Sequence, residues 1–213
     1  VSMFAQVACR QKTEESAGKE QSDSAAQTVN QEGNTPKHEP ETEDKLANSQ
    51  EPSIFERARI TQAKAICTNL QLAIEYFEAN YGFLPFPVEE KHPAKDQQLR
   101  AEGSLMLVLI GAEKEQNDKQ IRFLETRMAK GTETKGYKGG LHENGAKTAL
   151  YDPWGNTYYI LIDYDYDGEI EHPFEKGKVI NGEKVIVFSA GPDREIGSAD
   201  KNKDNVLSFK AED

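Results

Sequence analysis

A long polar stretch near the amino end limits how much of this chain can fold. Between Arg10 and Pro52 the only large apolar residues are Val29 and Leu46, and no aromatic residue occurs. Such a stretch cannot bury enough apolar surface to offset the roughly 1–2 kcal/mol of backbone entropy lost per ordered residue. We therefore predict a remnant of a signal peptide at residues 1–9, a disordered polar and acidic tether at 10–52, and a globular domain at 53–213.

The first nine residues are short and apolar and then give way to the tether. The tail of a signal peptide has this composition. Ala8-Cys9 can be the junction at which a bacterial lipoprotein is cut and its cysteine lipidated, and an ordinary secretory cleavage nearby is the alternative. Either predicts export to the periplasm, outer membrane or surface of a bacterium, with membrane contact only through an amino-terminal anchor.

The chain is acidic, with a formal net charge of −11. Phosphates would meet net repulsion, so we expect neither nucleic acid nor anionic lipid to bind through a basic surface. An acidic surface suits cation binding, although an ordinary solvated surface has the same charge.

A long amphipathic helix is predicted from Ser53 to Tyr81. Ser53 can cap its first turn and Glu56 can complete a capping box. Apolar residues then recur at steps of three and four, at Ala63, Ile66, Leu70, Ala73, Ile74, Phe77 and Tyr81. Gly82 can take the left-handed conformation that ends the helix. A second helix is expected over Asp96–Ile110, and residues 115–149 are expected to be mostly loop.

The last third reads as strands. Tyr158–Tyr166 alternates with a period of two, Val185–Phe188 is a second strand, and Val206–Phe209 is a short third. The glycine-bearing turns between them suit antiparallel pairing. The expected fold class is α+β: a long helix and a shorter one packed on a small, about three-stranded, antiparallel sheet.

One turn motif has a structural explanation. In Asp152-Pro153-Trp154-Gly155-Asn156 the aspartate can accept from backbone amides two residues on, and Pro153 presets the first turn dihedral. Gly155 or Asn156 can take a positive φ, which leaves Trp154 as an anchor in the core.

Acidic side chains gather in the final loop. Asp193, Asp200 and Asp204 share it with Ser198 and Asn205. Their charges would repel unless a Ca²⁺ ion, which takes six to eight oxygen ligands, neutralised them. The alternative from the residues alone is a solvated acidic turn.

A second, weaker metal candidate is Asp163, Asp165 and Asp167, followed by Gly168. These acids stand as in the first half of an EF-hand loop, but the twelfth position is Phe174 rather than glutamate, so a complete EF-hand is excluded. Glu169, Glu171 and Glu175 could help to hold a weak ion, and an acidic strand end and turn is the favoured interpretation.

Catalytic motifs are not evident. The four histidines are scattered, and none accompanies a serine or cysteine nucleophile motif. We therefore expect a non-enzymatic protein.

Three segments together resemble the type IV pilin-like proteins, most of all the major pseudopilin of type II secretion. They are Ala63–Pro85, the Asp152–Asn156 motif, and Phe188-Ser-Ala-Gly-Pro-Asp193 with the acids that follow. The resemblance implies a pilin-like fold, a terminal Ca²⁺ loop held by Asp193, Asp200 and Asp204, and partners among other pseudopilin or secretion-system subunits. It departs from the family in having the acidic tether where pilins carry a long apolar helix.

The function expected from this resemblance is structural: a subunit or accessory of a type II secretion or type IV pilus-like assembly in the cell envelope, with a calcium-stabilised loop. The alternative is a tethered, lipid-anchored or secreted, binding or adhesion module that does not polymerise.

Overall fold

The computed structural model describes residues 52–209. The predicted signal remnant, with its candidate lipidation site Cys9, and nearly all of the predicted tether therefore lie outside the described residues. The described elements, in chain order, are α1 (Ile54–Tyr81), β1 (Gln97–Arg100), α2 (Gly103–Leu109), β2 (Lys130–Thr132), β3 (Gly136–Lys138), β4 (Gly140–His142), β5 (Ala149–Tyr151), β6 (Tyr159–Ile162), β7 (Glu169–Glu171), β8 (Val179–Asn181), β9 (Val185–Ser189) and β10 (Val206–Leu207).

Helix α1 begins and ends where the sequence indicates. The Ser53 side chain accepts a hydrogen bond from the Glu56 backbone N–H at 3.2 Å, and Gly82 caps the other end with a φ of +79°. The Glu56 carboxylate accepts hydrogen bonds from Trp154 Nε1 at 2.9 Å and from Arg59 at 3.3 Å. This carboxylate therefore ties the first turn of α1 to the Trp154 turn.

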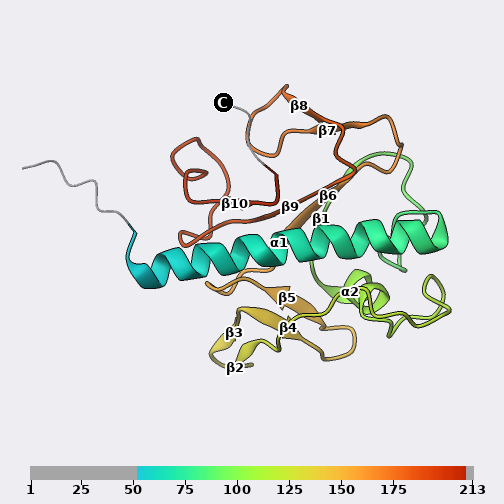
Figure 1. Ribbon diagram of the computed structural model, residues 1–213, viewed down its shortest axis with the longest axis horizontal. Coiled ribbons are helices and arrows are strands. Elements are labelled where there is room, and N and C mark those ends of the chain that lie inside the picture. The colour runs from blue at the N-terminus through green and yellow to red at the C-terminus, as the bar shows by residue number, and fades with distance from the viewer. Residues whose placement is uncertain (1–51, 210–213) are drawn as a thin grey trace, which may run out of the picture. The chain divides into compact units, whose positions relative to one another are not determined.

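The largest sheet has four strands in the order β1-β6-β9-β10, and every neighbouring pair is antiparallel. Helix α1 runs along this sheet and packs against β9 and β10 (Figure 1). Strands β6 and β9 are central, which agrees with their apolar sequences. The predicted third strand forms as the short edge strand β10.

Apolar side chains are buried on both faces of the four-stranded sheet. On the face toward α1, Ile160 and Val187 pack with Leu70 and Phe77 of the helix in one core cluster. On the other face, a second cluster comprises Leu161, Ile170, Ile186 and Phe188. The strands β6 and β9 are thus nearly continuous in apolar residues because both faces are covered.

Three two-stranded antiparallel sheets complete the described fold: β2–β3, β4–β5 and β7–β8. Strands β2, β3 and β4 lie within residues 115–149, which the sequence predicts to be mostly loop. Strand β5 begins at the end of that stretch and continues to Tyr151. Glycines permit these tight pairings. A Cβ on Gly131 would lie 2.0 Å from the Gly136 carbonyl oxygen across β2–β3, so only glycine fits there.

The expected pilin-like layout, with two helices on one small three-stranded sheet, is wrong. Among the described residues there are two helices, one of 28 residues and one of only seven, and the remaining elements are strands in four sheets. The predicted second helix over Asp96–Ile110 is the main cause. Its first part forms β1 instead, because pairing with β6 supplies backbone partners and buries part of Leu99 against the core.

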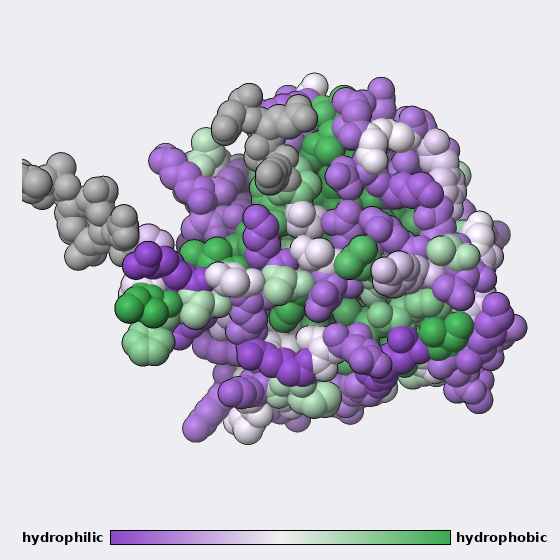
Figure 2. All heavy atoms as spheres, in the orientation of Figure 1, coloured by the Kyte–Doolittle hydropathy of each residue, from purple (hydrophilic) through white to green (hydrophobic). Residues whose placement is uncertain are grey.

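The surface is mixed. Figure 2 shows mainly hydrophilic residues on this face, with hydrophobic ones scattered among them and also present at the end where α1 begins. Ile54 and Phe55, in the first turn of α1, are 77 % and 81 % exposed. Neither of the helices in the described part of the chain is long and apolar enough to cross a membrane.

Candidate metal site

Two aspartates meet where the β1–β6 ladder ends. Gln97 of β1 pairs with Ile162 of β6 in antiparallel register. The residues one step beyond this pair are Asp96 and Asp163, so the register places them opposite each other. Like charges directly opposite on neighbouring strands are destabilising. The fold therefore concentrates negative charge at this end of the sheet.

Asp163 is the buried member of the pair, with a relative exposure of 1 %. Its Oδ2 accepts a hydrogen bond from the Gly168 N–H at 3.0 Å. Its Oδ1 is buried and has no hydrogen-bond partner among residues 52–209. A buried polar atom left without a partner costs roughly 1–3 kcal/mol. A proton on a neighbouring carboxyl group, a water molecule or a cation would remove this penalty.

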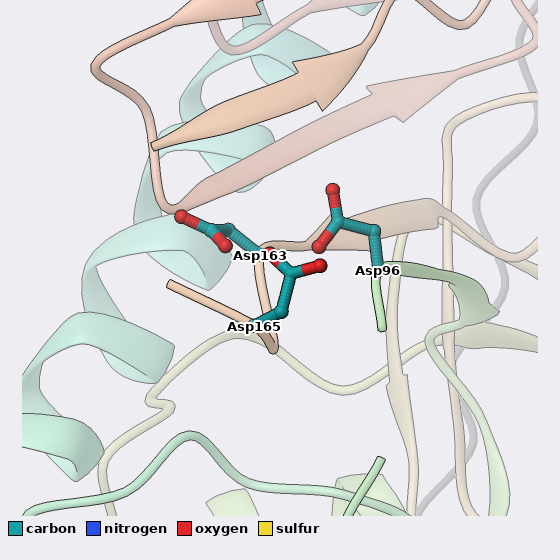
Figure 3. A group of neighbouring side chains, drawn as sticks. All are labelled: Asp96, Asp163 and Asp165. Atoms are coloured by element: carbon teal, nitrogen blue, oxygen red, sulfur yellow. The ribbon is translucent and has the colours of Figure 1, made fainter. Parts of the chain in front are cut away.

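Asp165 is the third member, contributed by the turn after β6. Tyr166 has a φ of +58° and Gly168 a φ of +81°, and the left-handed backbone at these two positions shapes the turn. One carboxylate oxygen from each of Asp96, Asp163 and Asp165 lies within 4.8 Å of the other two. Figure 3 shows the three side chains close together, with Asp165 between Asp163 on the left and Asp96 on the right. We call them the aspartate cluster.

The electrostatics of the aspartate cluster are unfavourable while all three carboxylates are ionised. The pKa of Asp96 is raised to about 6, mainly because burial disfavours the ionised form and secondly because of the charges of Asp165 and Asp163. A hydrogen bond that Asp96 accepts from the Tyr164 N–H at 3.2 Å opposes this shift. The pKa of Lys184 is raised, mainly by the hydrogen bonds that its ammonium group donates to both carboxylate oxygens of Glu78, at 2.9 and 3.0 Å. The charge of Asp163 is a smaller cause of this shift.

Such a cluster suits a hard divalent cation. Carboxylate oxygens are the ligands of Ca²⁺ and Mg²⁺, whereas Zn²⁺ more often takes nitrogen and sulfur. Ca²⁺ lies 2.3–2.6 Å from each ligand, so two of its ligands are at most about 5 Å apart. The separations in the aspartate cluster meet this limit. Because Asp165 is exposed, water can supply further ligands.

The weaker of the two predicted metal candidates is partly assembled. Asp163 and Asp165 belong to the aspartate cluster, while Asp167 does not. The Asp167 Oδ1 instead accepts a hydrogen bond from the Glu169 N–H at 2.8 Å, as in an acidic turn. Of the three glutamates suggested as helpers, Glu169, Glu171 and Glu175, none is in the group.

The stronger predicted candidate, in the final loop, is not gathered in this way. No group of three His, Cys, Asp or Glu side chains that includes Asp193, Asp200 or Asp204 comes together among residues 52–209. Lys203 donates to Asp200 at 2.6 Å, and the Asp204 side chain accepts from the Asp193 N–H at 3.0 Å. Groups within the loop thus donate hydrogen bonds to the Asp200 and Asp204 carboxylates.

The two accessory residues of that loop differ from each other. Ser198 is exposed, and its backbone oxygen accepts from the Lys201 and Asn202 N–H groups. Asn205 donates through Nδ2 to the Asn202 side chain at 3.2 Å, while its Oδ1 is buried without a partner. Calcium binding in the final loop stays a prediction.

The Asp152–Asn156 motif forms the expected turn. Asp152 is fully buried, and its Oδ1 accepts from the N–H groups of Trp154, Gly155 and Asn156 at 2.9, 2.6 and 2.9 Å. Its Oδ2 accepts from the Ser189 hydroxyl at 2.7 Å. Trp154 packs with Ala63, Val206 and Ile60. These residues, with Pro153 beside them, hold the turn against α1 and β9.

Sequence reasoning missed Asp96. The segment from Asp96 onward was interpreted as a helix, in which Asp96 would have been an ordinary first-turn acid. The available signal was the mixed sequence Gln97-Gln-Leu-Arg100, which suits an edge strand as well as a helix. Only the pairing of β1 with β6 reveals that Asp96 faces Asp163.

Comparison of the chain with protein-family models, with curated proteins and with solved structures finds no match. The aspartate cluster is therefore interpreted from its own geometry.

Proposed function

We propose that the folded part of this protein is a non-enzymatic binding or structural domain that a divalent cation, Ca²⁺ in the first place, stabilises at the aspartate cluster. The observation that carries the proposal is the buried, unpartnered Oδ1 of Asp163 beside two further carboxylates. A bound cation would satisfy this oxygen and neutralise the repulsion that raises the pKa of Asp96.

Ca²⁺ is favoured over Mg²⁺ for two physical reasons. Ca²⁺ accepts irregular shells of six to eight oxygens, whereas Mg²⁺ requires a near-octahedral shell at 2.0–2.1 Å and gives up its water reluctantly. In addition, extracellular Ca²⁺ modules work with dissociation constants of about 10⁻⁴–10⁻³ M, which a site with one exposed carboxylate can reach.

Thermal unfolding tests the proposal directly. At a Ca²⁺ concentration about ten times the dissociation constant, binding adds about 1.4 kcal/mol of stability. For a domain of this size the melting temperature should rise by about 4 °C relative to metal-free buffer. Mg²⁺ at the same concentration should give a smaller rise, and an unchanged melting temperature with Ca²⁺ would contradict the proposal.

Three variants locate the ion. Asp163→Asn keeps an oxygen for the Gly168 N–H but removes the charge, so it should abolish the Ca²⁺-dependent rise. Asp118→Asn removes an exposed charge elsewhere and should leave the rise intact. Asp200→Asn tests the final loop: if it abolishes the rise while Asp163→Asn does not, the ion binds in that loop and the assignment to the aspartate cluster fails.

The wider role that we propose is that of an exported protein of the bacterial cell envelope that works by binding other proteins. The support is the signal-like start of the sequence, the acidic composition and the motif resemblance to type II secretion pseudopilins. On this proposal its partners are other subunits of a secretion or pilus-like assembly. The proposal rests on those motifs and not on the arrangement of helices and strands.

A second candidate role is that of a tethered binding or adhesion module that does not polymerise. The Ala8-Cys9 junction favours it, since lipidation there would hold the chain at a membrane. Mass spectrometry of the protein isolated from its bacterial membrane distinguishes the two: a lipid on Cys9 supports the tethered module, and an apolar segment continuing upstream of Val1 supports the assembly subunit.

A further inference from the structure

A pocket of opposite charge lies elsewhere on this acidic protein. It has a volume of about 610 Å³ and is lined by five basic side chains and no acidic one: Arg59, Arg127, Lys130, Lys135 and Lys138. Arg59 belongs to α1, Lys130 and Lys138 to the β2–β3 hairpin, and Lys135 to the turn of that hairpin. We call this the basic pocket.

Two lysines of the β2–β3 hairpin lie where their like charges repel each other while no anion is bound. Lys130 and Lys138 are direct partners in the β2–β3 register. Like charges in this position destabilise a strand pair. Within residues 52–209, neither of them, nor Lys135 or Arg127, has a carboxylate partner within 4.0 Å, whereas Arg59 pairs with Glu56. The described residues therefore leave the positive charge of the basic pocket largely uncompensated.

Two hydrogen-bond donors lie beside Gly139, a residue that lines the basic pocket. The Arg127 Nε donates to the Gly139 carbonyl at 2.6 Å, which fixes the guanidinium group. A Cβ on Gly139 would lie 2.8 Å from Arg127 Nη2 and 3.1 Å from Gln62 Nε2. Both nitrogens therefore lie over the same point of the backbone. The Gln62 Nε2 is buried and has no hydrogen-bond partner in the described part of the chain.

We infer that the basic pocket binds a soluble compound that carries two or more phosphate or sulfate groups. An anionic oxygen beside Gly139 would accept hydrogen bonds from Gln62 Nε2 and from the guanidinium group of Arg127. The planar fork of this group matches the geometry of phosphate. The remaining oxygens would neutralise Lys130 and Lys138. The volume exceeds what one phosphate needs, and the charge is spread over five side chains, so a ligand with several anionic groups fits better than a single ion. A small ligand that reaches only this pocket meets local positive charge, whereas an extended anionic membrane would also face the acidic surface of a chain whose net charge is −11.

Isothermal titration calorimetry with inorganic tripolyphosphate tests this inference. The protein is first freed of metal and dialysed, because tripolyphosphate itself binds Ca²⁺. We expect saturable binding with one site per chain, and affinity that falls as KCl is added. Citrate, which offers carboxylates instead, should bind at least tenfold more weakly. No binding of tripolyphosphate at low salt, or tighter binding of citrate, would overturn the inference.

Matched variants assign the site. Lys130→Gln with Lys138→Gln should weaken tripolyphosphate binding about tenfold or more, since two charge-assisted contacts are lost. Lys91→Gln with Lys114→Gln removes the same charge from exposed positions outside the pocket and should change the affinity less than twofold. Equal losses in the two double variants would mean that only net charge matters, which contradicts a specific site.

Arg127 provides an internal comparison. Arg127→Lys keeps the charge but loses the planar fork, whereas Arg127→Gln loses both. If the guanidinium group binds the oxyanion, both variants should weaken binding, the glutamine variant more. Melting temperatures confirm that each variant is folded. Sedimentation with vesicles of anionic phospholipid is the last arm: binding to vesicles without binding to tripolyphosphate would contradict the inference.

Discussion

Asp96 and Asp163 lie opposite each other, one step beyond the last residue pair of the β1–β6 ladder. Pairing of β6 with β9 sets apolar and aromatic side chains side by side, but here the sheet register brings together two carboxylates, one of them buried. Asp165 adds a third. A proton or a cation can relieve this arrangement, and the two alternatives respond to pH in opposite directions.

The proton alternative predicts how stability depends on pH without metal. The pKa of Asp96 is raised to about 6 in the folded protein, above the usual value of 3.8. Asp96 therefore contributes stability below pH 3.8, and this contribution is lost as the pH rises to about 6. Denaturation by urea in chelator, from pH 4 to 7, should show this loss as a difference between the wild-type protein and Asp96→Asn.

The comparison with Asp96→Asn is essential because other acids shift the other way. The pKa of Glu89 is lowered by its hydrogen bond from the Ser104 hydroxyl, so Glu89 contributes stability above its unfolded pKa. With Ca²⁺ present the sign reverses for the aspartate cluster: the ion competes with the proton on Asp96, so its stabilising effect should grow between pH 5 and 7. A Ca²⁺ effect independent of pH in this range would place the ion elsewhere.

Asp152 should be a large contributor to stability. Its buried carboxylate accepts from three successive backbone N–H groups and from Ser189. Asp152→Ala leaves these buried donors without partners and should lower the free energy of unfolding by about 3 kcal/mol. Asp152→Asn keeps one acceptor oxygen and should cost about half as much. The fluorescence of Trp154, the single tryptophan, reports this unfolding; equal losses in both variants would mean that the charge, not the acceptor, matters.

Local patterns predicted part of this fold, and long-range pairing decided the rest. The α1 helix is predicted by its apolar residues at steps of three and four, by Ser53 as the first cap and by Gly82 as the last. These signals act within a few residues of one another. Strand β6 lies within Tyr158–Tyr166, where alternation with a period of two predicts a strand, and β9 follows from the apolar sequence Val185–Phe188. The position of Asp96 does not, because a segment such as Gln97–Arg100 becomes a strand only when β6 is available to pair with it.

The candidate sites show the same limit. The acids of the final loop are close in sequence, yet within the described residues no three of them lie together, and Asp200 and Asp204 accept hydrogen bonds from Lys203 and the Asp193 N–H. The aspartate cluster needs two segments that only the sheet register brings together. The basic pocket likewise combines α1, the β2–β3 hairpin and Arg127, and glycine-rich sequence alone gave no reason to expect that hairpin.

Cys67 should be unreactive in the folded protein. It is a free thiol, fully buried on α1, and burial raises its pKa far above the usual value, so almost no thiolate forms at neutral pH. Iodoacetamide should modify the Cys67 peptide only after urea unfolds the domain. The measurement is mass spectrometry of that peptide over time, with the same protein in urea as the control. Rapid modification without urea would show that α1 opens readily from the sheet.

Substitution of Gly191 tests how the final loop is closed, and substitution of Gly177, outside that loop, is the control. Gly191 and Gly177 have φ values of +68° and +82°, so alanine at either position should lose about 1–2 kcal/mol from the left-handed backbone alone. A Cβ on Gly191 would also lie 2.3 Å from the Asp204 carbonyl oxygen, whereas a Cβ on Gly177 would meet nothing within 4 Å.

Gly191→Ala should therefore lower the urea midpoint clearly more than Gly177→Ala, because the backbone at Asp204 must move away from β9. Trp154 packs with Val206 at the start of β10, so its fluorescence in the folded state should change in Gly191→Ala and not in Gly177→Ala. Similar midpoints for the two variants would mean that the loop yields without cost, and its carboxylates would then be free to rearrange around an ion.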